Sequence, residues 1–514
     1  MSELAEPAAG PPASGLISRS HLGIDPFELR LPASLAEAAA AVANGSWAHA
    51  GGIDVAQRLR AGEVADELVP LCAPRRSAGA GLERLTEISL GERSLFIGAG
   101  VSHARIESDP LVQAHRPDVA AAWRTIGNVR IRAAGTLGGN LAAFHPGYDA
   151  APILAAAGAE LIVAEPDGTE VRCAVADVPR HRLIVGCEIP LSGRVVYDRS
   201  LKPVVSVAVG EQAVAIGCAY AATCVIPHGA ANPEDVTAAV AALGDPIEDA
   251  FATAAYRRRM IDVLVDRCLR MHADPSTSRD DDGIGSPASP SDLASDTAPS
   301  DASSRDSAAS TAHVEMHPSG EPFTAAAAPV VTPPSDGAVH VGMRLNGESF
   351  AAAAPPSEML VDTIRTRAGL GATRVGCDQA VCGACTVLVD GVPTASCSTF
   401  AWQADGRSVL TIEAAGASVG ANAHDDVASI LPIVQGTFAE SSAFQCGYCT
   451  PGLILVAAAL LARHPDPDRA TICDWLDSNV CRCTGYLMVI EAVEAAAAAL
   501  GEHASTDVSA GSAA

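Results

Sequence analysis

Residues 376–397 read GCDQAVCGACTVLVDGVPTASC, and three of the cysteines in this stretch share one short loop. The spacing is Cys377-x4-Cys382-x2-Cys385, and Cys397 follows after eleven residues. In this plant-type [2Fe–2S] pattern, the loop wraps the cluster and the fourth cysteine comes from a later strand. Small residues in the loop let backbone N–H groups approach the sulfur atoms, which stabilises the reduced cluster. A four-cysteine zinc site is the alternative, but such sites usually use two short Cys-x2–4-Cys pairs.

A second set of four cysteines follows, in QCGYCTPG at residues 445–452 and NVCRCTGY at residues 479–486. Taken alone, two close cysteine pairs suit zinc as well as an iron–sulfur cluster. Because this set follows a plant-type loop, we predict that it holds a second [2Fe–2S] cluster. Its four ligands are Cys446, Cys449, Cys481 and Cys483. A further cysteine, Cys473, stands alone in a helical stretch and is expected in the core.

The segments around the cysteines predict two small domains. In residues 339–415, an Asn346-Gly347 turn between short strands, an amphipathic helix over 358–370 and later strands indicate a sheet curled around one helix. This is a β-grasp arrangement of the plant-type ferredoxin kind. In residues 416–501, four helical patterns indicate a four-helix bundle. The two cysteine pairs of the second set precede its second and fourth helices, so we expect them to meet at one end.

The composition divides the rest of the chain. A length of 514 residues is too great for one core and predicts several domains. We expect disordered tails at residues 1–24 and 502–514. A disordered linker is expected at 273–338, where eleven acidic residues and two arginines stand among Ser, Pro and Ala. Residues 25–272 then form a separate N-terminal domain of mixed α+β class.

Charge, cysteine content and hydropathy narrow the class of protein. A net charge of −26 disfavours nucleic acid and anionic membranes as partners. Fifteen cysteines without a recognisable secretory signal indicate a reducing compartment. The longest apolar run, at residues 452–462, is about half the length of a membrane span. We therefore expect a soluble cytoplasmic protein without a membrane span.

Two glycine pairs mark the N-terminal domain. A short strand leads into Gly51-Gly52 and then a helix, and Gly138-Gly139 is expected to repeat this arrangement. Free N–H groups at such a helix start bind phosphate, although an ordinary tight turn is the alternative for each pair. Asp149 is placed to cap the next helix or to accept a hydrogen bond from a ligand hydroxyl. Neither pair matches Gly-x-Gly-x-x-Gly, so we predict a diphosphate cofactor without a Rossmann fold.

These motifs resemble those of the molybdenum hydroxylase family, which includes xanthine dehydrogenase, aldehyde oxidoreductase and aerobic carbon monoxide dehydrogenase. The C-terminal half is similar to the small iron–sulfur subunit through GCDQAVCGACTVLVDG, QCGYCTPG and NVCRCTGY. The N-terminal half is similar to the flavin subunit through AGGIDV, TLGGN and AAYRRRMIDVL. The resemblance implies FAD and two [2Fe–2S] clusters as cofactors. The flavin contacts that it implies are Ala50, Gly51, Gly52, Ile53, Asp54, Val55, Ile126, Thr136, Leu137, Gly138, Gly139, Asn140, Asp149 and Lys202.

The resemblance also implies a partner. The family oxidises its substrates at a molybdenum–pterin centre on a large subunit, and this sequence has neither the length nor the glycine motifs for that centre. It is therefore identified as an electron-transfer subunit of an oxidoreductase whose molybdopterin lies on a separate chain, with Gln445 matching the residue that touches the pterin. The implied electron path runs from the second cysteine set to the plant-type set, to FAD and to NAD, a quinone, oxygen or a carrier protein. The implied assembly is a dimer of heterodimers.

Two features depart from the family pattern. Residues 217–246 form a shorter segment than is usual for the third part of the flavin subunit. The flavin half also precedes the iron–sulfur half, the reverse of the order in single-chain xanthine dehydrogenases, which suggests a fusion of separate subunits. The alternative function is a freestanding flavin and iron–sulfur reductase or electron carrier. The second cysteine set favours the molybdenum partner, because a plain ferredoxin needs only the first.

Overall fold

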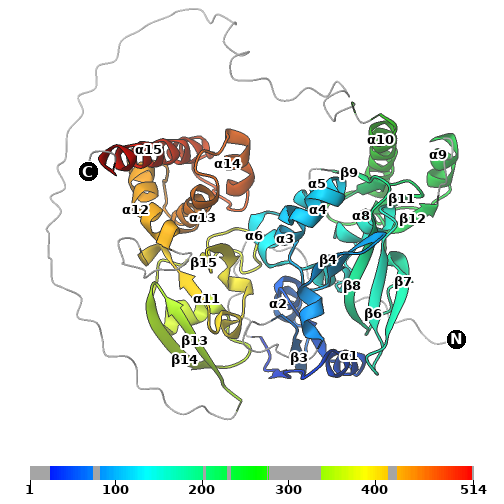
Figure 1. The fold of residues 1–514 in the computed structure, drawn as a ribbon, viewed down its shortest axis with the longest axis horizontal. Helices are drawn as coiled ribbons and strands as arrows, with labels where there is room; N and C mark the ends of the chain where they lie inside the picture. Colours follow the sequence, from blue (N-terminus) through cyan, green and yellow to red (C-terminus); the bar gives the residue numbers. More distant parts are fainter. Residues whose placement is uncertain are drawn as a thin grey trace, which may run out of the picture.

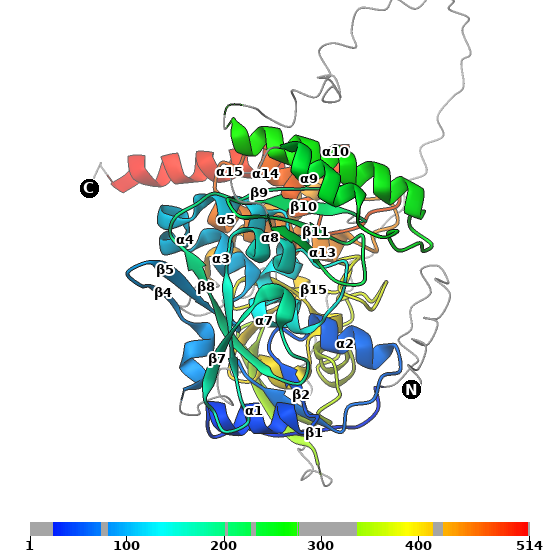
Figure 2. The ribbon, with the colours of Figure 1, turned by 90° about the vertical axis from the view of Figure 1, so that its right-hand side faces the viewer.

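The computed structural model describes residues 24–72, 81–200, 204–227, 233–274, 276, 337–414 and 425–511. Figure 1 shows the N-terminal domain beside the two cysteine-bearing domains, with α6 (Val129–Ala134) at the boundary between them. Figure 2 shows α10 (Ala254–Ala273) along one edge of the N-terminal domain. The predicted mixture of helices and sheets is confirmed. Almost all of the predicted N-terminal tail and linker lies outside the described residues.

A small parallel sheet opens the N-terminal domain and presents the first glycine pair. Its strands lie in the order β1-β3-β2. They are β1 (Glu28–Leu29), β2 (Trp47–His49) and β3 (Glu67–Pro70). Two helices connect them, α1 (Leu35–Ala43) and α2 (Ile53–Arg60). The predicted succession of strand, Gly51-Gly52 and helix is confirmed.

An antiparallel sheet of five strands forms the middle of this domain, in the order β4-β5-β8-β6-β7. The strands are β4 (Ile88–Leu90), β5 (Ser94–Gly98), β6 (Glu160–Ala164), β7 (Glu170–Ala174) and β8 (Leu183–Pro190). The helices between β5 and β6 are α3 (His103–Ser108), α4 (Pro110–His115), α5 (Pro117–Arg124), α6, α7 (Leu137–Ala142) and α8 (Ala150–Ala156). Sheet and helices share one apolar core around the fully buried Leu95, Trp123 and Ile153.

The second glycine pair differs from the prediction. Gly138 and Gly139 lie in the first turn of α7, and the element before it is helix α6 rather than a strand. The Thr136 hydroxyl caps α7 by accepting a hydrogen bond from the N–H of Gly139 at 3.1 Å. Because this cap starts a helix at once, the two glycines do not form an open loop.

A second antiparallel sheet completes the N-terminal domain, in the order β12-β11-β10-β9. Its strands are β9 (Val196–Arg199), β10 (Ser206–Val209), β11 (Ala213–Gly217) and β12 (Cys224–Pro227). α10 packs on β9 and β10, and α9 (Pro233–Ala241) lies beside β12. Buried valines of the strands and apolar residues of α10 form a separate core.

The ferredoxin domain is a mixed five-stranded sheet in the order β14-β13-β17-β15-β16. The strands are β13 (Val339–Leu345), β14 (Glu348–Ala354), β15 (Thr386–Val389), β16 (Val392–Ala395) and β17 (Ser408–Leu410). The predicted turn is confirmed, because Asn346 and Gly347 both have positive φ, 52° and 87°. The helix predicted over 358–370 is shorter, consisting of α11 (Leu360–Asp362) and one wider turn, Thr363–Arg367.

Four helices form the predicted bundle. They are α12 (Asp425–Glu440), α13 (Thr450–Arg463), α14 (Arg469–Leu476) and α15 (Leu487–Gly511). α15 continues to Gly511, past residue 501, where the sequence predicts the last domain to end. A glycine such as Gly501 costs only about 1 kcal/mol inside a helix. Cys473 is exposed on α14, so its predicted place in the core is wrong. The helices that the structure describes are each too short or too polar to cross a bilayer.

The N-terminal and ferredoxin domains share a buried interface. Phe27 and Leu68 of the first belong to the same apolar cluster as Phe400 of the second, and the rings of Phe27 and Phe400 meet edge-on with centroids 5.4 Å apart. A buried ion pair joins Arg60 Nη2 to Asp378 Oδ1 at 3.0 Å, one residue after the first cluster cysteine. The two halves, far apart in sequence, are therefore packed together at the plant-type loop.

Candidate cofactor sites

The plant-type loop directs its backbone toward its own sulfur atoms. The N–H groups of Gln379 and Cys382 donate to Cys377 Sγ at 3.4 and 3.2 Å. The N–H of Ala380, a residue with a positive φ of 58°, donates to Cys397 Sγ at 3.4 Å. Such N–H donors stabilise thiolates that bind iron. The loop therefore fits a [2Fe–2S] cluster.

The cysteine sulfur atoms of this set lie in mutual contact. Contact with the sulfur atoms of Cys382 and Cys397 holds the pKa of Cys377 far below its ordinary value, and contact with Cys377 raises the pKa of Cys382. Contact with Cys397 lowers the pKa of Cys385 to about 7; burial opposes this, and the positive charge of Arg130 supports it. Cys385 and Cys397 are buried. The fold thus brings together all four predicted ligands.

The second set gathers at one end of the bundle, ahead of α13 and α15. Cys446 Sγ and Cys483 Sγ are 3.6 Å apart, and both residues are exposed. Burial and then contact with Cys481 raise the pKa of Cys449 to about 12, so the other two sulfur atoms also meet. Within the described ranges, no three His, Cys, Asp or Glu side chains are arranged to hold a single metal ion.

Backbone hydrogen bonds join the two cysteine sets. The N–H of Val480 donates to the carbonyl of Cys382 at 2.8 Å. Next to it, Asn479 Nδ2 donates to the carbonyl of Gly383 at 3.1 Å. The segment that leads into Cys481 is therefore bonded directly to the plant-type loop, and the two sites are neighbours.

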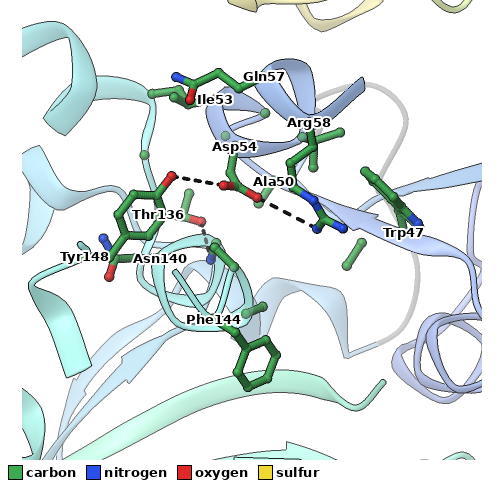
Figure 3. Close-up of a pocket in the computed structure, with 18 of the residues that line it drawn as sticks. Trp47, Ala50, Ile53, Asp54, Gln57, Arg58, Thr136, Asn140, Phe144 and Tyr148 are labelled. Carbon is green, nitrogen blue, oxygen red and sulfur yellow. Dashed lines mark hydrogen bonds and ion pairs between the residues drawn. The ribbon is translucent and has the colours of Figure 1, made fainter. Parts of the chain in front are cut away.

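A cavity of about 470 Å³ lies in the N-terminal domain between α2 and α7 (Figure 3), a size usual for cofactor pockets. The predicted flavin contacts that line it are Ala50, Gly51, Gly52, Ile53, Asp54, Val55, Ile126, Thr136, Gly139, Asn140 and Asp149. Leu137 and Gly138 are buried in α7 and are not among its lining residues. Lys202 lies outside the described residues, and Gln445 is exposed beside the second cysteine set.

One wall of the cavity offers backbone N–H groups. α2 begins there after Gly52, whose φ is 83° and which supplies no side-chain cap. The first-turn N–H groups of α2 therefore lack a capping side chain and carry the positive end of the helix dipole. A diphosphate would supply acceptors for them. This wall fits the diphosphate of FAD.

Gly51 lets the two glycine segments touch. A Cβ atom at this position would lie 1.9 Å from the carbonyl oxygen of Ala134 and 3.4 Å from Cα of Gly135. No side chain fits this approach of two backbones, so glycine is required. Thr136 follows Gly135 directly and caps α7. The close contact at Gly51 therefore sets the distance between the α2 wall and the α7 wall of the cavity.

Asp149 does not act as the predicted helix cap, because its side chain makes no capping hydrogen bond to α8. Its carboxylate instead accepts hydrogen bonds from the Tyr197 hydroxyl at 2.5 Å and from Arg199 at 3.2 Å. Burial raises the pKa of Asp149, and the charge of Arg199 opposes this. Because Asp149 lines the cavity, contact with a ligand hydroxyl stays a prediction.

Three further cavity residues were missed in the sequence. The Tyr148 hydroxyl donates to Asp54 Oδ1 at 3.0 Å, and Arg58 lies 3.9 Å from the other oxygen of the same carboxylate (Figure 3). The guanidinium of Arg58 also stacks over Trp47, 4.1 Å from the ring centroid. Burial and then the Asp54 charge raise the pKa of Tyr148, so its hydroxyl stays a donor. These residues come from separate elements, and no spacing in the sequence connects them.

The cavity wall also touches the plant-type loop. Gln57 of α2 lines the cavity, and its Nε2 donates to the carbonyl of Gln379 at 3.1 Å. Gln379 is the residue whose own N–H donates to Cys377 Sγ. One hydrogen-bonded side chain therefore connects this cavity to the plant-type loop.

Three family models match the chain. A model of the FAD-binding domain in molybdopterin dehydrogenases matches residues 25–178. A model of the 2Fe-2S iron–sulfur cluster binding domain matches residues 343–410, and a model of a [2Fe-2S] binding domain matches residues 419–494. The predicted order, flavin domain first and two iron–sulfur domains after it, agrees with these matches.

Known proteins are similar to parts of the chain. The nicotinate dehydrogenase small FeS subunit of Eubacterium barkeri is 42% identical over 138 residues, which are 27% of this chain and 82% of that protein. The xanthine dehydrogenase iron-sulfur-binding subunit of Escherichia coli O157:H7 is 40% identical over 141 residues, 27% of this chain and 81% of that protein. A chain of carbon monoxide dehydrogenase from Hydrogenophaga pseudoflava has a TM-score of 0.43 and 22% identity over 48% of this chain and 98% of its own.

The chain covers most of the length of these two iron–sulfur subunits, and the residues matched by the model of the FAD-binding domain lie in the same chain. The chain therefore belongs to the molybdenum hydroxylase family and carries an FAD-binding domain and two [2Fe–2S] domains of its electron-transfer subunits.

Proposed function

We propose that this chain conducts electrons between a molybdopterin centre on a separate, larger subunit and an external acceptor. The observation that carries the proposal is the order of the three sites. The second cysteine set is exposed, its neighbour Val480 bonds to the plant-type loop, and that loop bonds through Gln379 to Gln57 of the flavin cavity. When bound, the two clusters carry single electrons and the flavin accepts or delivers them in pairs.

The residues of this chain then have three tasks. The four cysteines of each set hold one cluster, and those of the plant-type set are the more deeply buried, away from solvent. The N-terminus of α2 and the segment at Thr136 hold the diphosphate of FAD between them. Gln57 and Val480 keep neighbouring sites in contact, which keeps the distances for electron transfer short. We propose the domain limits that the sequence predicts, 25–272, 339–415 and 416–501, with α15 continuing past the last of these limits to Gly511.

A surface for the partner surrounds the exposed cysteines. Phe444, Tyr448, Val480 and Leu487 are large apolar residues, 44–55% exposed, and each lies within four residues of a cysteine of the second set. Exposed apolar groups gathered in one place mark interaction sites. Gln445 lies among them, so we propose that this apolar surface meets the molybdopterin subunit.

Replacing Phe444 with glutamate should separate the partner from an otherwise intact chain. A charge in an apolar interface costs several kcal/mol, so we expect at least a tenfold loss of the larger, molybdenum-containing subunit when the tagged chain is purified from cells that make both. The iron and FAD content per chain should not change. Phe251→Glu is the matched control, since Phe251 is 60% exposed on the N-terminal domain.

A wild-type chain that purifies with its iron and FAD but without any molybdenum-containing subunit would support the freestanding reductase instead. The acceptor at the flavin, among NAD, a quinone, oxygen and a carrier protein, and assembly as a dimer of heterodimers belong to the proposal. Titration of the reduced complex with each acceptor and its mass in solution test these two points.

A further inference from the structure

Three buried arginines of the N-terminal domain reach the cluster domains. Arg60 pairs with Asp378 at 3.0 Å. Arg132 pairs with Glu107 at 3.0 Å and with Asp474 of α14 at 3.1 Å. Arg130 lies on the same helix as Arg132, but it has no carboxylate within ion-pair distance among the described residues. It is only 1% exposed.

Arg130 stands at the junction of the two cysteine sets. Its Nη2 donates to the carbonyl of Val381 at 3.1 Å and also to the carbonyl of Ser478. Val381 directly precedes Cys382, and Ser478 lies three residues before Cys481. Nε and Nη1 of Arg130 are buried and have no hydrogen-bond partner in the described part of the chain.

An unpaired guanidinium in this position needs a negative partner. Removing a cation from water costs several kcal/mol unless an anion or hydrogen bonds compensate, and two carbonyl oxygens satisfy only one of its nitrogen atoms. Arg130 is hydrogen-bonded to the carbonyl of Val381, which directly precedes the predicted ligand Cys382. The groups nearby that become anionic are the cluster thiolates.

We propose that Arg130 is an electrostatic positioning residue of the plant-type cluster. Its positive charge makes that cluster easier to reduce and so favours electron transfer from the second cysteine set toward the flavin. The inference rests on the proposed function, because it requires a [2Fe–2S] cluster on the four plant-type cysteines. Reduction adds one negative charge to a cluster that is already anionic. A fixed positive charge in a buried site of low dielectric stabilises the reduced form more than the oxidised form.

The test is the reduction potential of each cluster in the purified full chain, followed by electron paramagnetic resonance during a redox titration. In Arg130→Gln, the equilibrium for one-electron reduction of the plant-type cluster should weaken at least tenfold, which is a fall of about 59 mV for a one-electron couple. Arg130→Lys keeps the charge and should stay within that interval of the wild type.

Arg132→Gln is the matched control. It lies on the same helix and is also buried, and its loss removes a contact between the same two domains, but its charge is balanced by Glu107 and Asp474. We expect no tenfold change in this variant. If Arg132→Gln and Arg130→Gln shift the potential equally, or if Arg130→Gln shifts it less than tenfold, the proposal is wrong.

Metal content separates this proposal from the proposed function. A wild-type chain that lacks the two clusters contradicts the function itself, whereas unchanged potentials in a chain with both clusters contradict only the role of Arg130. Should Arg130→Gln lose its clusters, Arg130→Lys decides the matter: a potential close to that of the wild type supports the proposal, and a tenfold or greater shift overturns it.

Discussion

Replacing Cys382 with alanine is expected to remove about two of the roughly four irons predicted per chain, and the loss should be confined to the plant-type cluster. Alanine supplies no ligand atom, and the Cys382 sulfur is in contact with that of Cys377 inside the loop. Cys449→Ala removes the other pair of irons in the same way, because Cys449 meets Cys481 at the end of the bundle. Iron analysis and electron paramagnetic resonance of the reduced protein measure the two losses.

Cys473→Ala is the control for both cysteine variants. Cys473 is exposed on α14 and belongs to neither set, so this variant should keep all of the iron and both resonance signals. A Cys382→Ala or Cys449→Ala protein that retains the full iron content would contradict the assignment of ligands. Zinc in place of iron in the wild type would favour the alternative metal for that set.

Replacing Gly51 with alanine weakens FAD binding by about a hundredfold or more, equivalent to roughly 2.7 kcal/mol. The added Cβ would meet the carbonyl oxygen of Ala134 at 1.9 Å, so the segment before α2 and the segment before α7 must move apart. The N–H groups at the start of α2 and those near Thr136 then no longer face one diphosphate. Titration of the flavin-free protein with FAD, followed by fluorescence, gives the affinity.

Gly147→Ala provides the comparison for Gly51. Gly147 lines the same cavity, but its added Cβ would meet only the exposed side chain of His145, at 3.1 Å, so a shift of a few tenths of an ångström in that ring would make room for it. We expect less than a threefold change in affinity. Equal losses in the two variants would mean that the approach of Gly51 to Ala134 does not shape the site. The iron content should stay the same in both variants, since neither glycine touches a cluster cysteine.

The cysteine sites were predictable because each depends on the spacing of cysteines within short segments of the sequence. Cys377, Cys382 and Cys385 lie within one loop, and the loop's own N–H groups complete the site. The pairs of the second set each stand before a helix, so the bundle brings them to one end. The Asn346-Gly347 turn was predictable for the same reason, since two residues with positive φ decide it.

The flavin cavity was only partly predictable. Its glycines are marked by sequence, but Arg58 stacks on Trp47 only once α2 packs beside β2, and Tyr148 reaches Asp54 only once α2 packs against the segment beyond α7. Asp149 shows the same limit, because its partners Tyr197 and Arg199 come from a distant strand. The role predicted for it as a helix cap was wrong, as burial beside these partners outweighs a local capping bond.

The boundary between the domains could not be derived from the sequence either. A linker predicted to be flexible gives no reason to expect one fixed arrangement, yet Arg60, Arg130 and Arg132 all reach from the N-terminal domain to the cluster domains. The misplacement of Cys473 and the early end predicted for the last helix have a simpler cause. Both judgements relied on residue type, whereas α14 carries its cysteine on an exposed face and α15 continues through Gly501.

The central claim is that one chain holds two clusters and one flavin in electronic contact. Its most direct test is a reductive titration of the purified wild-type chain without air, with iron and FAD measured on the same sample. We predict about four irons and one FAD per chain, and an uptake of about four electrons, one for each cluster and two for the flavin. A chain that binds FAD but takes up only two electrons and contains no iron would contradict the account.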